Sequence, residues 1–113
     1  TVAATPPLVD AMVHIDATFE SLLDAVDPDL PGPHGGPSKP RILELSALLH
    51  EQFREAVRIR TAETALSMIQ HMKLAEHAAA ALARAGRQNP SAVSARIRAL
   101  RSTCHTCHRL YRN

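Results

Sequence analysis

The stretch PLVDAMVHIDATFESLLDAV, residues Pro7–Val26, decides the fold class. Its apolar residues recur at alternating steps of four and three: Leu8, Met12, Ile15, Phe19, Leu22 and Val26. This spacing places them on one stripe of an α-helix, the side that packs against other helices in a bundle. Pro6 and Pro7 suit the first turn of such a helix. The sequence therefore predicts an amphipathic helix over residues 7–26.

Three more segments carry the same periodicity. Residues 27–40, DPDLPGPHGGPSKP, are rich in helix breakers and predict a loop that Ser38 closes by capping the next helix. No glycine or proline occurs between Arg41 and Gly86, and one helix of that length is unusual in so small a domain. We therefore divide this region near residues 59–64, with Thr61 as a candidate cap. Gly86 is expected to end the third helix, and Asn89-Pro90 to start a fourth that runs to about Arg112.

Composition agrees with an all-α antiparallel four-helix bundle formed by a single domain over residues 1–113. The chain is 45% apolar, rich in alanine and only 3% aromatic, which favours helices over strands. The formal net charge of +2 is too small to indicate nucleic-acid binding, and no apolar run approaches the ~18–20 residues of a membrane helix. The opening TVAATPP lacks an initiator Met and a basic-then-apolar leader, which fits a mature or trimmed protein.

The chemistry is concentrated in the last predicted helix, which contains both cysteines of the chain in the stretch RSTCHTCHRLYRN. Cys104, Cys107 and His108 form a Cys-x-x-Cys-His motif, the attachment signature of c-type haem. Side chains three and four apart share one helical face, so two thioether bonds and an imidazole can serve the same porphyrin. A disulfide and a partial zinc site are the alternatives. The sequence has neither the βαβ pattern of thioredoxin-like proteins nor a second cysteine pair.

The same residues carry a family resemblance. A C-terminal Cys-x-x-Cys-His followed by RLYR, together with PLVDAM at the start of the first helix, resembles the class II c-type cytochromes. These are cytochrome c prime and its low-spin relatives, which are four-helix bundles with one covalent haem. The resemblance implies that Cys104 and Cys107 bind haem c and that His108 is the proximal iron ligand. It also implies an exported, periplasmic protein, because bacteria attach this haem outside the cytoplasm.

Met12 decides which branch of the family the chain resembles. Low-spin members have a methionine at this place as the sixth ligand, whereas high-spin members have an apolar residue and a five-coordinate iron. We expect Met12 to ligate iron, with a core-filling methionine as the alternative. His50 and His71 are weaker candidates for the sixth position. The expected function is a one-electron carrier and not an enzyme, and the alternative is a gas-binding protein for NO or CO.

Charge is uneven along the chain. The first helix and the following loop are acidic, and the last helix is basic, with Arg96, Arg98, Arg101, Arg109 and Arg112. These could be two solvated faces that attract each other. Arg101 and Arg112 are candidates to pair with the haem propionates, and the basic side could meet an acidic redox partner protein. We expect neither nucleic-acid binding nor membrane insertion, and the sequence leaves monomer and homodimer open.

Overall fold

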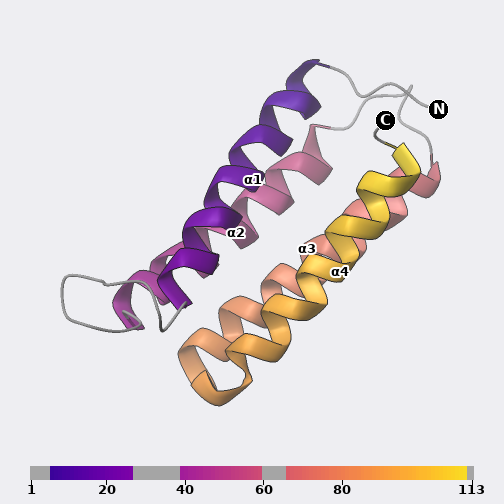
Figure 1. The fold of residues 1–113 in the computed structure, drawn as a ribbon. Helices are drawn as coiled ribbons and strands as arrows, with labels where there is room; N and C mark the ends of the chain where they lie inside the picture. The colour runs from indigo at the N-terminus through magenta and orange to yellow at the C-terminus, as the bar shows by residue number, and fades with distance from the viewer. Residues whose placement is uncertain (1–5, 27–38, 60–65, 112–113) are drawn as a thin grey trace.

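Four α-helices make up most of the part of the chain described by this computed structural model, which covers residues 6–26, 39–59 and 66–111. They are α1 (Pro6–Val26), α2 (Lys39–Arg58), α3 (Leu66–Gln88) and α4 (Val93–Tyr111), with a short 3-10 turn, η1 (Pro90–Ala92), before α4. Figure 1 shows consecutive helices running in opposite directions. No strand occurs within the described ranges. The prediction of an all-α protein with four helices is confirmed.

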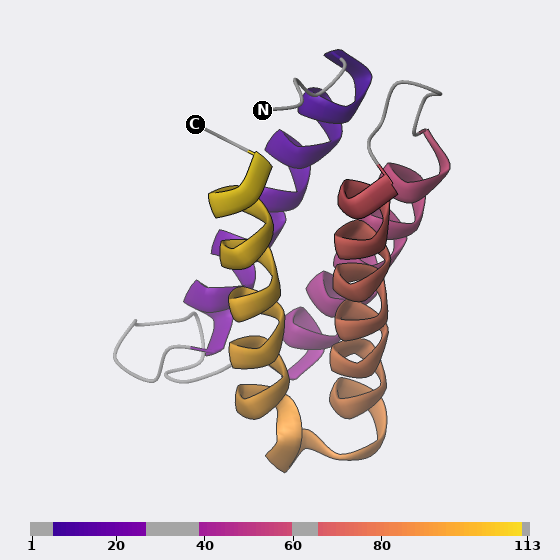
Figure 2. The same ribbon diagram turned by 90° about the vertical axis from the view of Figure 1, so that its right-hand side faces the viewer.

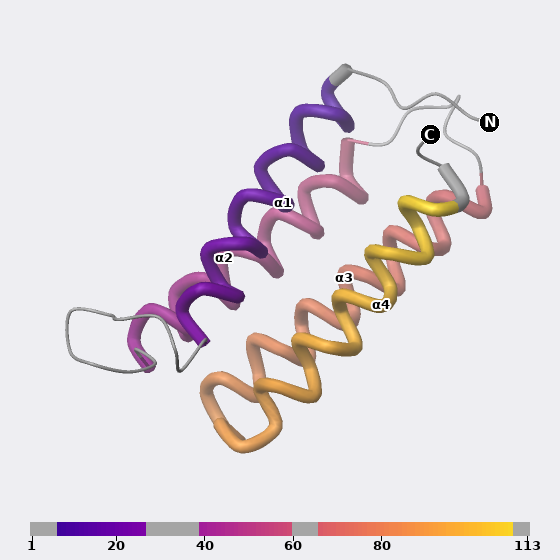
Figure 3. The backbone as a smooth tube through the Cα atoms, viewed as in Figure 1, coloured from indigo at the N-terminus to yellow at the C-terminus, as the bar shows by residue number. Residues whose placement is uncertain are grey.

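The helices pack in chain order and form an elongated body of 46 × 24 × 20 Å. α1 packs on α2, α2 on α3, and α3 on α4. α1 and α4 make at most a marginal backbone contact, and Figures 1 and 3 show their backbones well apart. Figure 2 shows α3 and α4 side by side, joined by η1. Two helices therefore have two neighbours each, while α1 and α4 have one each.

The core consists of the predicted apolar stripes. Its largest fully buried side chains are Leu8, Leu22, Leu49, Met72, Leu82 and Leu100. Alanines of α2 and α3, among them Ala56, Ala75 and Ala79, are buried where those two helices meet their neighbours. Small side chains allow helices to approach closely, so an alanine-rich chain with few aromatics can still close a core.

The structure corrects the expectation that Gly86 ends the third helix. Gly86 was predicted to cap the C-terminus of that helix, but α3 continues through Gln88, and Gly86 is buried within it. A Cβ atom at this position would lie 3.2 Å from Leu43 Cδ2 and 4.0 Å from Ser46 Oγ, both on α2. The glycine is present because α2 comes close, and not because the chain turns.

The other boundaries differ by one to three residues. α1 begins at Pro6, one residue earlier than predicted, and α2 begins at Lys39, the residue after the predicted cap. Pro90 starts η1, and the α-helical hydrogen-bonding pattern begins at Val93. Residues 27–38 of the predicted loop 27–40, including Ser38, lie outside the described residues, as does Thr61 in the predicted division. Among the described helices, none is long and apolar enough to cross a membrane.

Candidate functional site

Cys104, Cys107 and His108 lie on one side of α4, near the C-terminal end of the described helix. All three side chains are half-buried, and both thiols are free. An uninterrupted helix produces this arrangement, because spacings of three and four residues bring side chains to the same face. The Thr103 hydroxyl donates to the Ala99 carbonyl at 3.0 Å, so it is satisfied within the helix.

These three residues line a pocket to which all four helices contribute. Its lining comprises Met12, Ile15 and Asp16 from α1, Phe53 from α2, Met72 and Ala75 from α3, and Cys104, Cys107 and His108 from α4. The free space enclosed there is about 20 Å³, far below the roughly 300–1,000 Å³ of a ligand pocket, so a large ligand would need the lining side chains to move apart. Polar groups enter the pocket only from α1 and α4, so a ligand there would meet mostly apolar walls.

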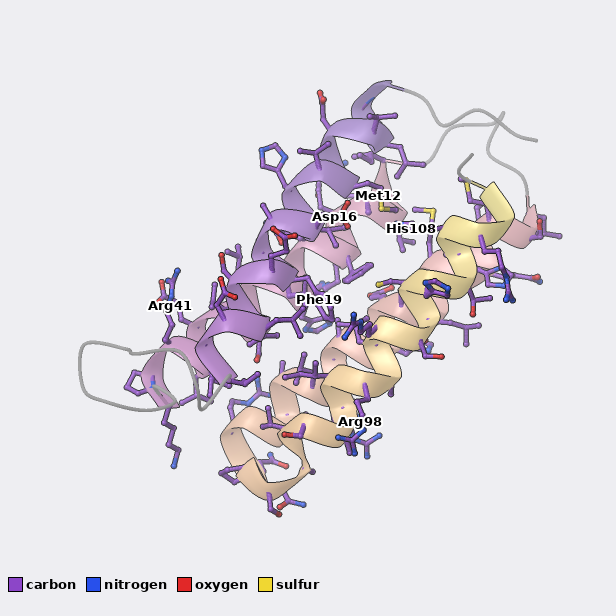
Figure 4. The ribbon with its side chains drawn as sticks, viewed as in Figure 1. Met12, Asp16, Phe19, Arg41, Arg98 and His108 are labelled. Carbon is purple, nitrogen blue, oxygen red and sulfur yellow. The ribbon has the colours of Figure 1, made fainter. Side chains whose placement is uncertain are left out.

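Met12 reaches this pocket from the opposite side to His108. Figure 4 shows the two side chains directed toward the same space between α1 and α4. Met12 is half-buried and also packs against the hydrophobic core. The structure thus brings the predicted pair of ligands to one pocket, although Met12 has packing contacts of its own.

The apolar stripe of α1 is unevenly covered along this side. Leu8, Ile15 and Leu22 are almost completely buried, whereas Met12 and Phe19 are half-buried. On a helix these alternate positions lie on the two sides of one seam. α2 covers one side, and the other side faces the space toward α4. The apolar side chains of Met12 and Phe19 therefore remain partly exposed to solvent on the side of α1 that faces the pocket.

The same change occurs along α4. Val93, Ile97 and Leu100 are buried, while Cys104 and Cys107, which continue the stripe, are only half-buried. Both incompletely covered stretches meet at the pocket. Within the described chain, the side chains of α4 are therefore less buried around the two cysteines than in the first half of the helix.

Burial keeps the thiols protonated. It raises the pKa of Cys104 from 9.0 to about 11, with smaller contributions from Cys107 and from the Asp16 carboxylate. Burial also raises the pKa of Cys107. Redox-active and metal-binding cysteines usually have a lowered pKa, because the thiolate is the reacting form. This environment is the reverse of the one in a thioredoxin-like dithiol.

Metal binding by protein side chains alone finds little support. Within the described residues, no group of three or more His, Cys, Asp and Glu side chains is arranged to hold a metal ion. A structural zinc site would need four such ligands in tetrahedral geometry, and a catalytic one would need three. The zinc alternative for the cysteine pair therefore has no geometric basis in the described part of the chain.

The competing histidines lie outside the pocket lining. His50 and His71 are half-buried, and neither lines the hollow that contains His108. His71 Nδ1 donates to the Ser67 carbonyl at 2.8 Å, and His14 Nδ1 makes the same kind of bond to the Asp10 carbonyl. His105, between the cysteines, is exposed. The structure thus brings Met12, and neither His50 nor His71, to the pocket of His108.

Of the two arginines expected near propionates, Arg101 is exposed on α4. It lies seven residues before His108, so the two are about two turns apart on nearly the same side of the helix. Arg112 lies outside the described residues.

A haem group fits the residues at this pocket. Two cysteines at the attachment spacing and a neighbouring imidazole are the groups that hold c-type haem, and the thioether from the facing helix is a candidate sixth iron ligand. The apolar walls and the incompletely covered seams suit a large apolar ring. Phe53 and Met72, both buried, would bound it from α2 and α3.

Asp16 is the pocket residue whose role the sequence left unassigned. It stands four residues after Met12, so helical spacing alone places the two on one face. The available signal was an acidic residue next to a predicted apolar stripe.

Comparisons with family models, with curated proteins and with solved structures give no match for this chain.

Proposed function

We propose that this protein is a monohaem c-type cytochrome that carries single electrons and is not an enzyme. Cys104 and Cys107 would hold haem c covalently, with His108 and Met12 as the axial iron ligands. The observation that carries the proposal is the pocket in which Met12 of α1 meets the Cys-x-x-Cys-His residues of α4. When bound, the haem would supply an iron that alternates between two oxidation states.

The residues of the chain suit that task. A ligand pair of methionine and histidine favours the reduced state more than two histidines do. Buried Phe53 and Met72 would exclude water from the ring. His108 and Met12 project from opposite helices of one packed body, so the same pair can serve both oxidation states with little rearrangement. The resemblance to class II cytochromes also supports export to the periplasm.

One observation favours a second function. Met12 already packs against the hydrophobic core, which is what a methionine that does not bind iron would do. A five-coordinate iron with His108 alone would leave a site for NO or CO. The protein would then resemble the high-spin members of the family.

Visible absorption spectroscopy distinguishes the electron-carrier function from the gas-binding function. With Met12 as ligand, the oxidised protein shows the weak far-red methionine–iron band, and the reduced protein shows sharp bands that do not respond to CO. Met12→Ala should then open the site and make the reduced spectrum CO-sensitive. The matched control is Met68→Ala, a buried methionine of α3 outside the pocket lining, which should stay insensitive.

The opposite results would be equally clear. A wild-type protein whose reduced spectrum already changes with CO would favour the gas-binding function. A chain that has passed through haem maturation and shows no haem absorption would reject both functions.

A further inference from the structure

One flank of α4 carries an uninterrupted row of basic side chains. Arg98, Arg101, His105 and Arg109 follow one another at steps of three, four and four, so they form a single stripe on the helix. All four are exposed, and α4 contains no acidic residue. We call this row the α4 stripe. Figure 4 shows Arg98 extending outward from α4.

The stripe is not neutralised within the described structure. None of its arginines has an ion-pair or hydrogen-bond partner among the described residues. By contrast, Arg54 and Arg58 of α2 pair with Glu51 and Glu55 one turn earlier on their own helix. Of the acidic residues of α1, Asp16 lies in the pocket near Cys104, whereas Asp10, Glu20 and Asp24 are exposed.

The stripe lies beside the pocket. Arg96, on the other flank of α4, lines a groove with Ala81 and Ala85 of α3, which shows which flank faces α3. The stripe is on the opposite flank. Arg101 lies two turns from His108 on nearly the same side, and Arg109 follows His108 directly. A partner bound to the stripe would therefore sit next to the residues that hold the haem.

We propose that the α4 stripe is the docking surface for an acidic patch on a protein redox partner, an inference that rests on the proposed electron-carrier function. Arginines on a rim steer an oppositely charged partner and orient it, more than they add affinity. Docking here would bring the partner next to the side of α4 that carries His108.

Two other anionic partners fit less well. A membrane or a nucleic acid presents negative charge over a wide area, which would also meet the exposed acidic residues Asp10, Glu20 and Asp24 of α1. Single-stranded nucleic acid also needs aromatic side chains on which to stack, and the chain is only 3% aromatic. A protein with a confined acidic patch can bind the stripe and avoid α1.

The test uses the full haem-loaded chain and poly-L-glutamate as the acidic probe, with binding measured by calorimetry at low salt. The double variant Arg98→Glu/Arg109→Glu should bind about tenfold more weakly, because each change removes an attraction and adds a repulsion. Arg84→Glu/Arg87→Glu on α3 changes net charge equally and is the control, expected to change affinity less than about twofold. Circular dichroism confirms that both variants fold.

A second measurement links the surface to electron transfer. The reduced protein is mixed with anionic hexacyanoferrate(III), which accepts one electron from it, and the rate is followed by stopped flow. The stripe variant should react several times more slowly at low salt, and the difference should shrink as salt screens the charges. The control variant should keep the wild-type rate.

Several results would overturn the proposal. They are no binding of poly-L-glutamate, equal losses in stripe and control variants, or an unchanged rate with hexacyanoferrate(III). Tighter stripe-dependent binding to phosphatidylglycerol vesicles or to single-stranded DNA would also overturn it, and would indicate a membrane or a nucleic acid instead. A haem-containing protein with any of these results would reject the docking surface alone, whereas missing haem absorption would reject the proposed function.

Discussion

At the scale of single residues, Asp16 is the pocket residue whose charge should most affect the reduction potential of a bound haem. It places a carboxylate in a pocket whose walls are mostly apolar, close enough to Cys104 to help raise the pKa of that thiol. A negative charge near a haem iron stabilises the oxidised form, which carries one more positive charge than the reduced form. Asp16 would therefore oppose the effect of Met12 on the reduction potential.

Replacing Asp16 by Asn should raise the reduction potential. Removing the charge favours the reduced form, by up to roughly tenfold in the equilibrium constant, or about 59 mV for one electron. Spectroelectrochemical titration measures the shift. Asp24→Asn is the control, because Asp24 is an exposed carboxylate of the same helix that solvent screens. Equal shifts in the two variants would reject a specific effect of Asp16.

The Cys104 thiol gives a prediction about pH in the haem-free chain. Its pKa of about 11 in the folded state exceeds the ordinary value of 9.0, because burial disfavours the thiolate. The stability associated with the buried neutral thiol is fully present below pH 9 and is lost as pH rises to about 11. Folding should therefore protect Cys104 from alkylation between these two pH values.

Iodoacetamide labelling at increasing pH, read by fragmentation mass spectrometry of the peptide that contains both cysteines, measures this protection. The rate at Cys104 should have its midpoint near pH 11 in buffer and near pH 9 in denaturant. The denatured chain is the control. Identical midpoints in the two conditions would mean that the thiol is not buried as the structure has it.

At the scale of helices, the contact of α2 with α3 depends on Gly86. A Cβ atom there would already be 3.2 Å from the flexible end of Leu43, so a larger side chain would force the helices apart. Gly86→Val should lower the free energy of unfolding by about 2 kcal/mol through overpacking, despite the usual helix penalty of glycine. Urea unfolding of the haem-free chain measures it.

The control for this variant is Gln88→Val, which places the same side chain on an exposed position of α3 two residues later. It should change stability by less than about 0.5 kcal/mol. If Gly86→Val were equally harmless, the close approach of α2 at Gly86 would be wrong, and the glycine would have the capping role that the sequence suggested.

The helices also show which features a sequence can and cannot predict. The stripe in α1 predicted the buried set Leu8, Ile15 and Leu22 correctly, because periodicity is local. It could not show that Met12 and Phe19 would be half-buried, since that depends on how far α4 stands from α1. Gly86 was misread for the same reason: its role is set by a neighbouring helix and not by the residues around it.

At the scale of the whole molecule, the sequence predicted the proposed haem-binding residues better than it predicted the other residues that line their pocket. The motif on α4, together with the resemblance to class II cytochromes that points to Met12, nominated four residues, and these meet in one pocket. Asp16 could have been nominated from its spacing to Met12, but Phe53 and Met72 could not be nominated as pocket residues. Their place depends on the relative rotation and height of separate helices, which residue spacing within one helix does not determine.

The arrangement of neighbours leads to a last prediction, about local stability. α2 and α3 each pack on two helices, whereas α1 and α4 each pack on one, and their half-covered seams meet at the pocket. Elements with fewer packed neighbours open at lower free energy. In the haem-free chain, hydrogen exchange should therefore be slowest in the middle of α2 and α3, and faster in α1 and in the part of α4 around Cys104.

Haem would change this order if it occupies the pocket. A group that binds the folded state stabilises the elements it joins, and covalent attachment to α4 with a ligand from α1 would join these two. Loading should slow exchange around Met12 and Cys104 far more than around Ala79, which is buried in both forms. Met12→Ala separates the contributions: if Met12 ligates iron, the variant keeps the added protection in α4 and loses it in α1. Equal protection of α1 in the variant and the wild type would mean that packing, and not ligation, holds α1 to the haem.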